Sequence, residues 1–156
     1  MDDNTREAGP ANQEVEANKK LNILLVEDEP MITMLIEDVL AYHNITSFTA
    51  AEKALDELRK AKGVGSSFDW VITDKGLEGK MDGFGLADLI KNEKLGNPYV
   101  TLLTGSAAVI EKENTPEELK DKGIDHLMGK PFKLEELEDS VKTVRKFIEQ
   151  SQSPQT

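Results

Sequence analysis

Cysteine is absent from this chain of 156 residues. Without cysteine the protein can form no disulfide bond and no thiolate metal site, and it suits a reducing cytoplasm, where we expect it to reside. No apolar run approaches the roughly 20 residues that a membrane-spanning helix requires. The N-terminus is acidic and polar, and it lacks the apolar stretch of a signal peptide. We therefore expect no membrane contact.

Positive charge is also scarce. The chain has 19 Lys and Arg against 30 Asp and Glu, so its formal net charge is −11. Phosphate backbones repel such a protein, and we expect no nucleic-acid partner. The length fits one domain with tails. Residues 1–18 are polar and acidic and are predicted to be disordered, residues 19–150 form the domain, and residues 151–156 form a flexible tail.

Short apolar runs alternate with segments of helical periodicity. The apolar runs are residues 21–26, 45–49, 68–73, 99–103 and 124–128. The helical segments are residues 31–42, 51–61, 84–91 with Asp82 as cap, a segment that begins after Thr115, and 134–148. Five strand-helix units in strict alternation predict an α/β fold, a doubly wound five-stranded parallel sheet with helices on both faces.

Several other side chains have structural interpretations. We expect Met31, Met34 and Trp70 to take part in core or rim packing. His43 ends the first helical segment, where it is expected to complement the negative end of the helix dipole. His126 is expected to lie within the last strand in a surface or half-buried position. Neither histidine is expected to carry a phosphoryl group.

Polar residues follow four of the apolar runs. Glu27 and Asp28 follow the first run, and Asp74, Thr104 and Lys130 follow the third, fourth and fifth. In a doubly wound sheet the carboxyl ends of the strands carry the site. Carboxylates, a hydroxyl and an ammonium at one edge suit a hard divalent cation and a phosphoryl group. Taken singly, the acidic pair could complement a helix dipole and Asp74 could be a solvated strand end.

Five motifs in order resemble those of one family, the receiver domain of bacterial two-component response regulators. The motifs are residues 24–29, residues 71–74, Met81-Asp82-Gly83, Leu103-Thr104-Gly105 and Lys130-Pro131-Phe132. The resemblance covers roughly residues 19–150. It implies a flavodoxin-like (βα)5 fold with strand order 2-1-3-4-5, and a cis peptide bond between Lys130 and Pro131.

The resemblance also implies the chemistry. Asp74 is the phosphoacceptor, which attacks the phosphohistidine of a sensor histidine kinase or a histidine phosphotransfer protein. Thr104 and Lys130 each contact a phosphoryl oxygen.

The implied cofactor is Mg²⁺. By resemblance Asp28 and Asp74 bind it directly, Glu27 binds it through water, and the backbone carbonyl of Gly76 completes the protein ligands. Three like charges this close to one another require a cation.

Three features depart from the family pattern. The loop 75–80 is one residue longer than usual and has no proline. The stretch 104–123 is about four residues longer and contains a capping box at Thr115–Glu118, so the helix there is predicted to be short or broken. Leu127 replaces the usual aromatic switch residue, so we expect phosphorylation to shift the segment 104–122 instead.

Few residues follow the last helix, so we expect a stand-alone receiver. It would signal by binding a downstream target protein or by passing the phosphoryl group onward, with no enzymatic activity beyond its own phosphorylation and dephosphorylation. One alternative is a degenerate receiver that binds proteins without phosphorylation, which Leu127 and the altered loops favour. Another is a Mg²⁺-dependent phosphatase or phosphotransferase, which would carry a second acid where Gly76 stands.

Overall fold

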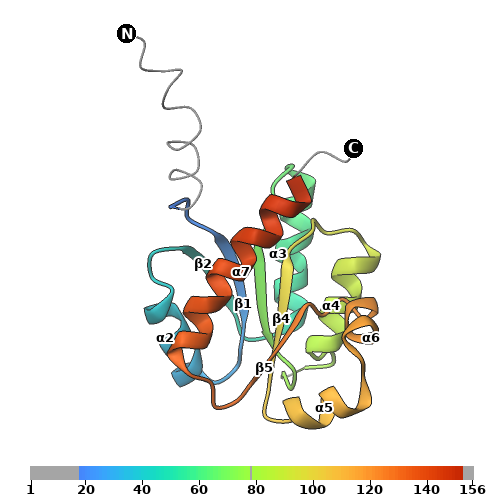
Figure 1. Ribbon diagram of the computed structural model, residues 1–156. Coiled ribbons are helices and arrows are strands. Elements are labelled where there is room, and N and C mark those ends of the chain that lie inside the picture. Colours follow the sequence, from blue (N-terminus) through green and yellow to red (C-terminus); the bar gives the residue numbers. More distant parts are fainter. Residues whose placement is uncertain (1–17, 78, 153–156) are drawn as a thin grey trace.

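The computed structural model describes residues 18–77 and 79–152, apart from the side chain of Gln152. Five parallel strands form one sheet in the order β2-β1-β3-β4-β5, as predicted (Figure 1). The strands are β1 (Asn22–Val26), β2 (Asn44–Phe48), β3 (Trp70–Asp74), β4 (Tyr99–Thr104) and β5 (His126–Gly129). The predicted N-terminal tail lies, up to residue 17, outside the described residues.

The helices cover both faces of the sheet. They are α2 (Pro30–Val39), α3 (Ala51–Gly63), α4 (Gly83–Asn92), α5 (Ala107–Glu113), α6 (Pro116–Asp121) and α7 (Leu134–Gln152). Helices α2 and α7 pack on one face, and the other four contribute to the core on the opposite face (Figure 1). Helix α7 runs two residues into the segment predicted as a tail. Among the described helices, none combines the length and the apolar character needed to cross a bilayer.

The central strands are apolar on both faces because helices cover both. Strand β3 is buried along its whole length, and Trp70 donates its indole N–H to Thr101 Oγ1 at 2.9 Å. Trp70 is therefore core, as predicted. The prediction for the two methionines was wrong, because Met31 and Met34 are 81% and 67% exposed. They lie outside the buried stripe of α2, to which Ile36 belongs.

The segment between β4 and β5 is broken, as predicted. Helix α5 ends before Asn114, which is extended, and α6 begins after Thr115. The Thr115 side chain accepts from Glu118 N at 3.1 Å, while Thr115 N donates to Glu118 Oε1 at 2.7 Å. This reciprocal capping box starts a new helix. In α5, Ile110 is buried while Val109 is 54% exposed.

His43 does not serve as a cation at a helix end. Its Nδ1 accepts a hydrogen bond from Leu21 N at 3.0 Å. This bond connects the turn that follows α2 to the residue that precedes β1. Burial first, and then the charges of Arg145 and Lys20, hold its pKa below the ordinary value of 6.5. The ring is therefore a neutral acceptor. The half-buried structural role is confirmed, and the dipole interpretation is corrected.

We expect acid to weaken the fold through His43. A histidine whose folded-state pKa is depressed contributes stability above its unfolded pKa, and this contribution is lost as the pH falls through about 6.5 toward the folded value. Protonation of Nδ1 also removes the acceptor for Leu21 N. The free energy of unfolding, measured by urea titration from pH 7.5 to 5.0, should fall less in His43→Asn than in the native protein.

His126, whose pKa is also lowered by burial against an opposing effect of Glu136, stays in both proteins and cancels in the comparison. If the free energy of unfolding fell equally steeply with pH in the two proteins, His43 would not be the source of the acid sensitivity.

Candidate functional site

The residues predicted for the site meet at the carboxyl edge of the sheet. Val26 pairs with Thr73, so Glu27 and Asp74 leave adjacent strands side by side. Asp74 ends β3 opposite Leu103 of β4. Thr104 pairs with Gly129 of β5, and the next residue along the chain is Lys130. The strand register alone therefore brings together groups that are up to 103 positions apart in the chain.

The Lys130 ammonium lies at the centre of the site. Its Nζ is 3.1 Å from Asp74 Oδ1, 3.0 Å from Glu27 Oε1 and 3.2 Å from Glu29 Oε1. The Lys130-Pro131 peptide bond is cis, as predicted. Burial opposes the charge of Lys130, but the ion pairs with Glu27 and Asp74 outweigh it and raise its pKa above the ordinary value. The ammonium is thus charged and directed at Asp74.

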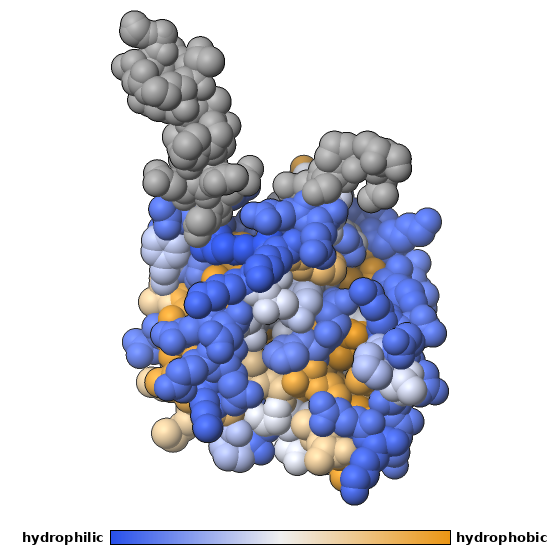
Figure 2. Space-filling model, viewed as in Figure 1, coloured by the Kyte–Doolittle hydropathy of each residue, from blue (hydrophilic) through white to orange (hydrophobic). Residues whose placement is uncertain are grey.

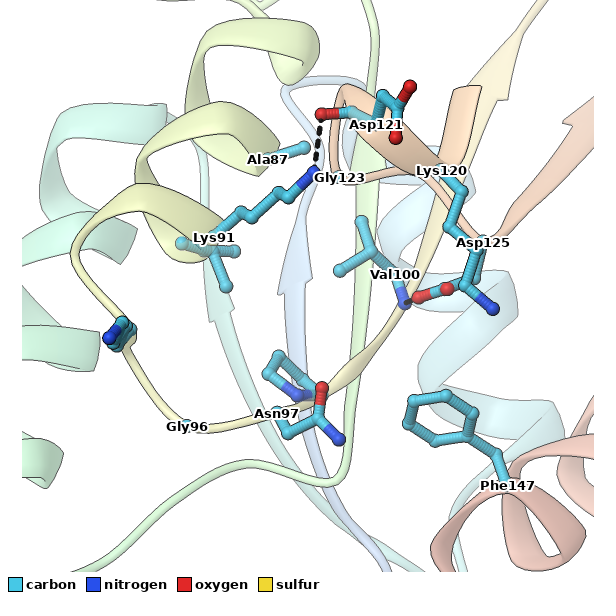
Figure 3. A pocket seen from close by; sticks show the side chains of 13 residues that line it. Ala87, Lys91, Gly96, Asn97, Val100, Lys120, Asp121, Gly123, Asp125 and Phe147 are labelled. Carbon is cyan, nitrogen blue, oxygen red and sulfur yellow. Dashed lines mark hydrogen bonds between the residues drawn. The ribbon is translucent and has the colours of Figure 1, made fainter. Parts of the chain in front are cut away.

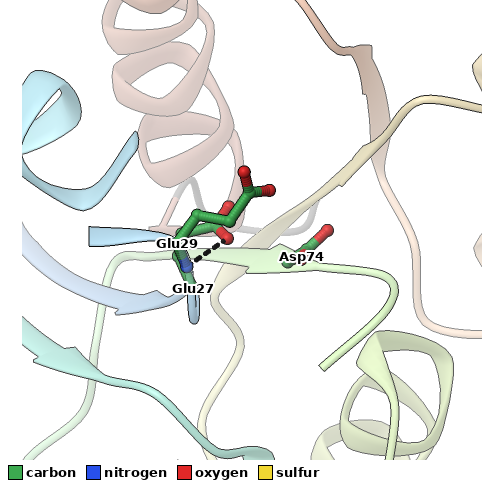
Figure 4. Close-up of side chains that lie close together, drawn as sticks. All are labelled: Glu27, Glu29 and Asp74. Atoms are coloured by element: carbon green, nitrogen blue, oxygen red, sulfur yellow. Dashed lines mark hydrogen bonds between the residues drawn. The ribbon is translucent and has the colours of Figure 1, made fainter. Parts of the chain in front are cut away.

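Three carboxylates converge around this ammonium. Ligand oxygens of Glu27, Glu29 and Asp74 lie within 4.8 Å of one another (Figure 4). The Glu27 side chain is fully buried, and its Oε2 accepts a hydrogen bond from Glu29 N at 3.1 Å. Burial first, and then the charge of Asp74, raise the pKa of Glu27 against the opposing effects of Glu29 N and Lys130. A buried carboxylate in this position is costly unless a further cation is present.

The carboxylate set fits a hard divalent cation. Three carboxylates and one ammonium leave two net negative charges at the site. Glu27 Oε1 is at ion-pair distance from Lys130 but accepts no hydrogen bond from any described group, so a buried oxygen has spare ligand capacity. Mg²⁺ takes carboxylate oxygens and waters and offsets this charge. Glu27, Glu29 and Asp74 are the residues that would hold it.

Glu29 was not assigned as a ligand from the sequence. It is the third acidic residue of the first motif, and its side chain is 60% exposed. The turn after β1 brings Glu29 close to the Glu27 carboxylate, and Glu29 N donates a hydrogen bond to Glu27 Oε2. An acidic residue two positions after the first one was the available signal.

Three other predicted residues lie around the cluster. Asp28 is half-buried and is not one of the three converging carboxylates. Gly76 is exposed, with open space around it. Thr104 is buried, and its hydroxyl accepts a hydrogen bond from Ser106 N at 3.0 Å, within its own loop. The structure places all three at this edge, and their roles in phosphoryl and metal binding stay predictions.

The Met81-Asp82-Gly83 motif brings α4 against the end of β3. A Cβ on Gly83 would lie 2.4 Å from the carbonyl oxygen of Asp74, so only glycine permits this approach. Gly83 N donates to Lys75 O at 3.0 Å, which closes the base of the loop. Asp82 caps α4 by accepting from Gly85 N at 2.9 Å, as predicted. The Met81-Asp82-Gly83 motif therefore positions the backbone of Asp74.

A separate cavity of about 540 Å³ lies near the start of β4, at the opposite edge of the sheet (Figure 3). Lys91 and Asp125 both line it, but each is already engaged. Lys91 Nζ donates to Asp121 O at 2.8 Å, and Asp125 accepts from Val100 N at 2.9 Å (Figure 3). Neither lining aspartate belongs to a metal-ligating cluster within the described part of the chain. We therefore assign the chemistry to the carboxyl edge.

Residues 23–142 match the family model described as "Response regulator receiver domain". The chain belongs to the response regulator receiver domain family. It is 32% identical over 117 residues to "Transcriptional regulatory protein TcrA" of Mycobacterium tuberculosis (strain ATCC 25618 / H37Rv), a match that covers 75% of this chain and 43% of that protein. The chain thus spans less than half the length of this curated relative.

Solved receiver structures share the fold. The receiver domain of sensor histidine kinase PA1611 from Pseudomonas aeruginosa PAO1, solved with a magnesium ion in its active site cleft, superposes with a TM-score of 0.67. The two chains are 24% identical, and the match covers 82% of this chain and 99% of that one. Chemotaxis protein CheY4 of Vibrio cholerae gives a TM-score of 0.66 at 22% identity, covering 81% and 99%.

Magnesium is expected to stabilise the native protein. A ligand that binds only the folded state at about 100 times its Kd adds about 2.7 kcal/mol to the free energy of unfolding. Glu27→Gln removes one of three charged ligands, so we expect about tenfold weaker binding and about 1.4 kcal/mol less stabilisation at the same concentration. Urea unfolding with Mg²⁺ or with a chelator measures both values. If Mg²⁺ raised the free energy of unfolding equally in the variant and in the native protein, Glu27 would not be a Mg²⁺ ligand.

Proposed function

We propose that the protein accepts a phosphoryl group on Asp74 from a phosphohistidine of a sensor histidine kinase or a histidine phosphotransfer protein, in a Mg²⁺-dependent reaction in the cytoplasm. The observation that carries the proposal is the position of Lys130 Nζ, 3.1 Å from Asp74 Oδ1 within a cluster of three carboxylates. When an aspartate at a strand end receives an anionic phosphoryl group, a neighbouring ammonium offsets the added negative charge.

In the proposed reaction, an Asp74 carboxylate oxygen attacks the phosphorus atom. The O–P bond of an acyl phosphate forms, the P–N bond to the imidazole breaks, and the imidazole leaves with the electron pair and takes up a proton. Lys130 holds one phosphoryl oxygen as a point charge, and Thr104 holds another after releasing Ser106 N. When bound, Mg²⁺ neutralises charge on the phosphoryl oxygens.

We further propose that the signal leaves through the broken segment between β4 and β5. Leu127 has no ring that could turn inward, and with Leu119 and Ile124 it lines a cavity of about 400 Å³ beside α6. Phosphoryl binding would draw Thr104 from Ser106 and bias α5 and α6. NMR shifts with and without a beryllofluoride mimic test this proposal, and an unmoved segment 104–122 would refute it.

The proposed output is contact with a downstream target protein or transfer of the phosphoryl group to another protein. Receiver domains interact with histidine kinases and downstream targets. Since the curated relative is named a transcriptional regulatory protein, the lack of nucleic-acid binding stays a prediction from charge.

Intact-mass measurement tests the proposed function. After incubation with acetyl phosphate and Mg²⁺, the protein should gain one phosphoryl group, and a chelator should suppress the gain. No gain at any Mg²⁺ concentration would instead favour a receiver that binds proteins without phosphorylation, which is the alternative that Leu127 and the altered loops support.

A further inference from the structure

We infer that Glu52 is a positioning residue that anchors the loop between Asp74 and α4, and thereby sets the magnesium affinity of the site. The inference rests on the proposed function, because this loop carries Gly76, whose backbone carbonyl the family resemblance implies as a Mg²⁺ ligand. Glu52 lies in the first turn of α3, an element that contributes no group to the carboxylate cluster.

The anchor consists of two backbone hydrogen bonds to one carboxylate oxygen. Glu52 Oε2 accepts from Lys80 N at 3.1 Å and from Met81 N at 3.0 Å. Glu52 is half-buried, and no described cation forms an ion pair with its carboxylate. Its charge is therefore available for these two N–H groups, and charge-assisted hydrogen bonds are the stronger kind.

Gly79 is shaped to receive this carboxylate. Its φ of +94° is a conformation that side chains rarely adopt, and a Cβ there would lie 3.1 Å from Glu52 Oε1. The carboxylate thus packs against a bare Cα while Oε2 binds the next two amides. The backbone conformation and the hydrogen bonds point independently to the same contact.

The loop needs such an anchor. It is longer than the family pattern and has no proline. Gly83 N to Lys75 O closes its base, and the partly buried Leu77 packs against the core. Between these points and α4, the Glu52 contact fixes the outer part of the loop. Releasing that contact restores backbone freedom to the segment that includes Gly76.

Glu52→Ala tests the anchor by two measurements. Amide hydrogen exchange, read without Mg²⁺, should accelerate at Lys80 and Met81. The Mg²⁺ Kd, read by calorimetry, should rise about tenfold, the equivalent of one lost charge-assisted hydrogen bond. Glu52→Gln keeps an oxygen acceptor, so its exchange protection at Lys80 and Met81 should be close to that of the native protein. This result would show that the effect of Glu52→Ala comes from the lost acceptor and not from a general loss of packing.

Glu57→Ala is the matched control, since Glu57 lies on the same helix and its side chain forms no hydrogen bond with any described residue. It should leave the exchange rates and the Kd unchanged. Unchanged exchange and Kd in Glu52→Ala, or an equal Kd change in Glu57→Ala, would overturn the inference. If the native protein binds no Mg²⁺ while Glu52→Ala still accelerates exchange, the proposed function fails and the anchor stands.

Discussion

Asp74→Asn is expected to abolish the gain of phosphoryl mass with acetyl phosphate and Mg²⁺. An amide oxygen is too weak a nucleophile to form the acyl phosphate. Asp74 is the one residue of the carboxylate cluster that lies within a strand, as the last residue of β3, and its Oδ1 is 3.1 Å from Lys130 Nζ. The variant also removes one of three mutually repelling carboxylates. We therefore expect the fold to persist, with a free energy of unfolding within about 1 kcal/mol of native.

Asp88→Asn is the matched control for this experiment. Asp88 lies exposed on α4, the helix that follows the site loop, and it is not part of the carboxylate cluster. This variant should gain the same phosphoryl mass as the native protein, at the same rate. If Asp74→Asn gains the mass as well, the acyl phosphate forms on another carboxylate and the proposed role of Asp74 is wrong.

Most of the architecture could be predicted because it depends on local patterns. Apolar runs of about five residues, each followed by a helical stripe, predict the parallel sheet before any contact is known. The carboxyl ends of those runs then lie at one edge, where Asp74 and Lys130 are found 3.1 Å apart. The capping box at Thr115 predicted the break between α5 and α6 in the same way, since its signal spans four residues.

Features that depend on tertiary placement could not be predicted. The role of His43 follows from its contact with Leu21, which lies 22 positions earlier in the chain. The exposure of Met31 and Met34 depends on which stripe of α2 meets the sheet, and a hydrophobic residue gives no sign of that alone. Glu29 and Glu52 act through the direction in which a turn or a helix points a carboxylate, and composition does not encode direction.

Gly83→Ala is expected to damage the fold and the site together. The added Cβ would lie 2.4 Å from the carbonyl oxygen of Asp74 and 2.7 Å from Leu102 Cδ1. The first contact is with backbone in the most buried strand, so it cannot be relieved by a rotamer change. We expect a loss of about 2–4 kcal/mol in the free energy of unfolding, measured by urea titration.

The matched control is Gly63→Ala at the last residue of α3, where an added Cβ would meet nothing within 4 Å. Alanine favours the helix there, so the free energy of unfolding should stay unchanged or rise by up to about 1 kcal/mol. If Gly→Ala lowers the free energy of unfolding at position 83 but not at position 63, helix propensity does not explain the requirement for Gly83. The close approach to Asp74 does. A Gly83→Ala protein as stable as native would mean that α4 can withdraw from β3 at little cost.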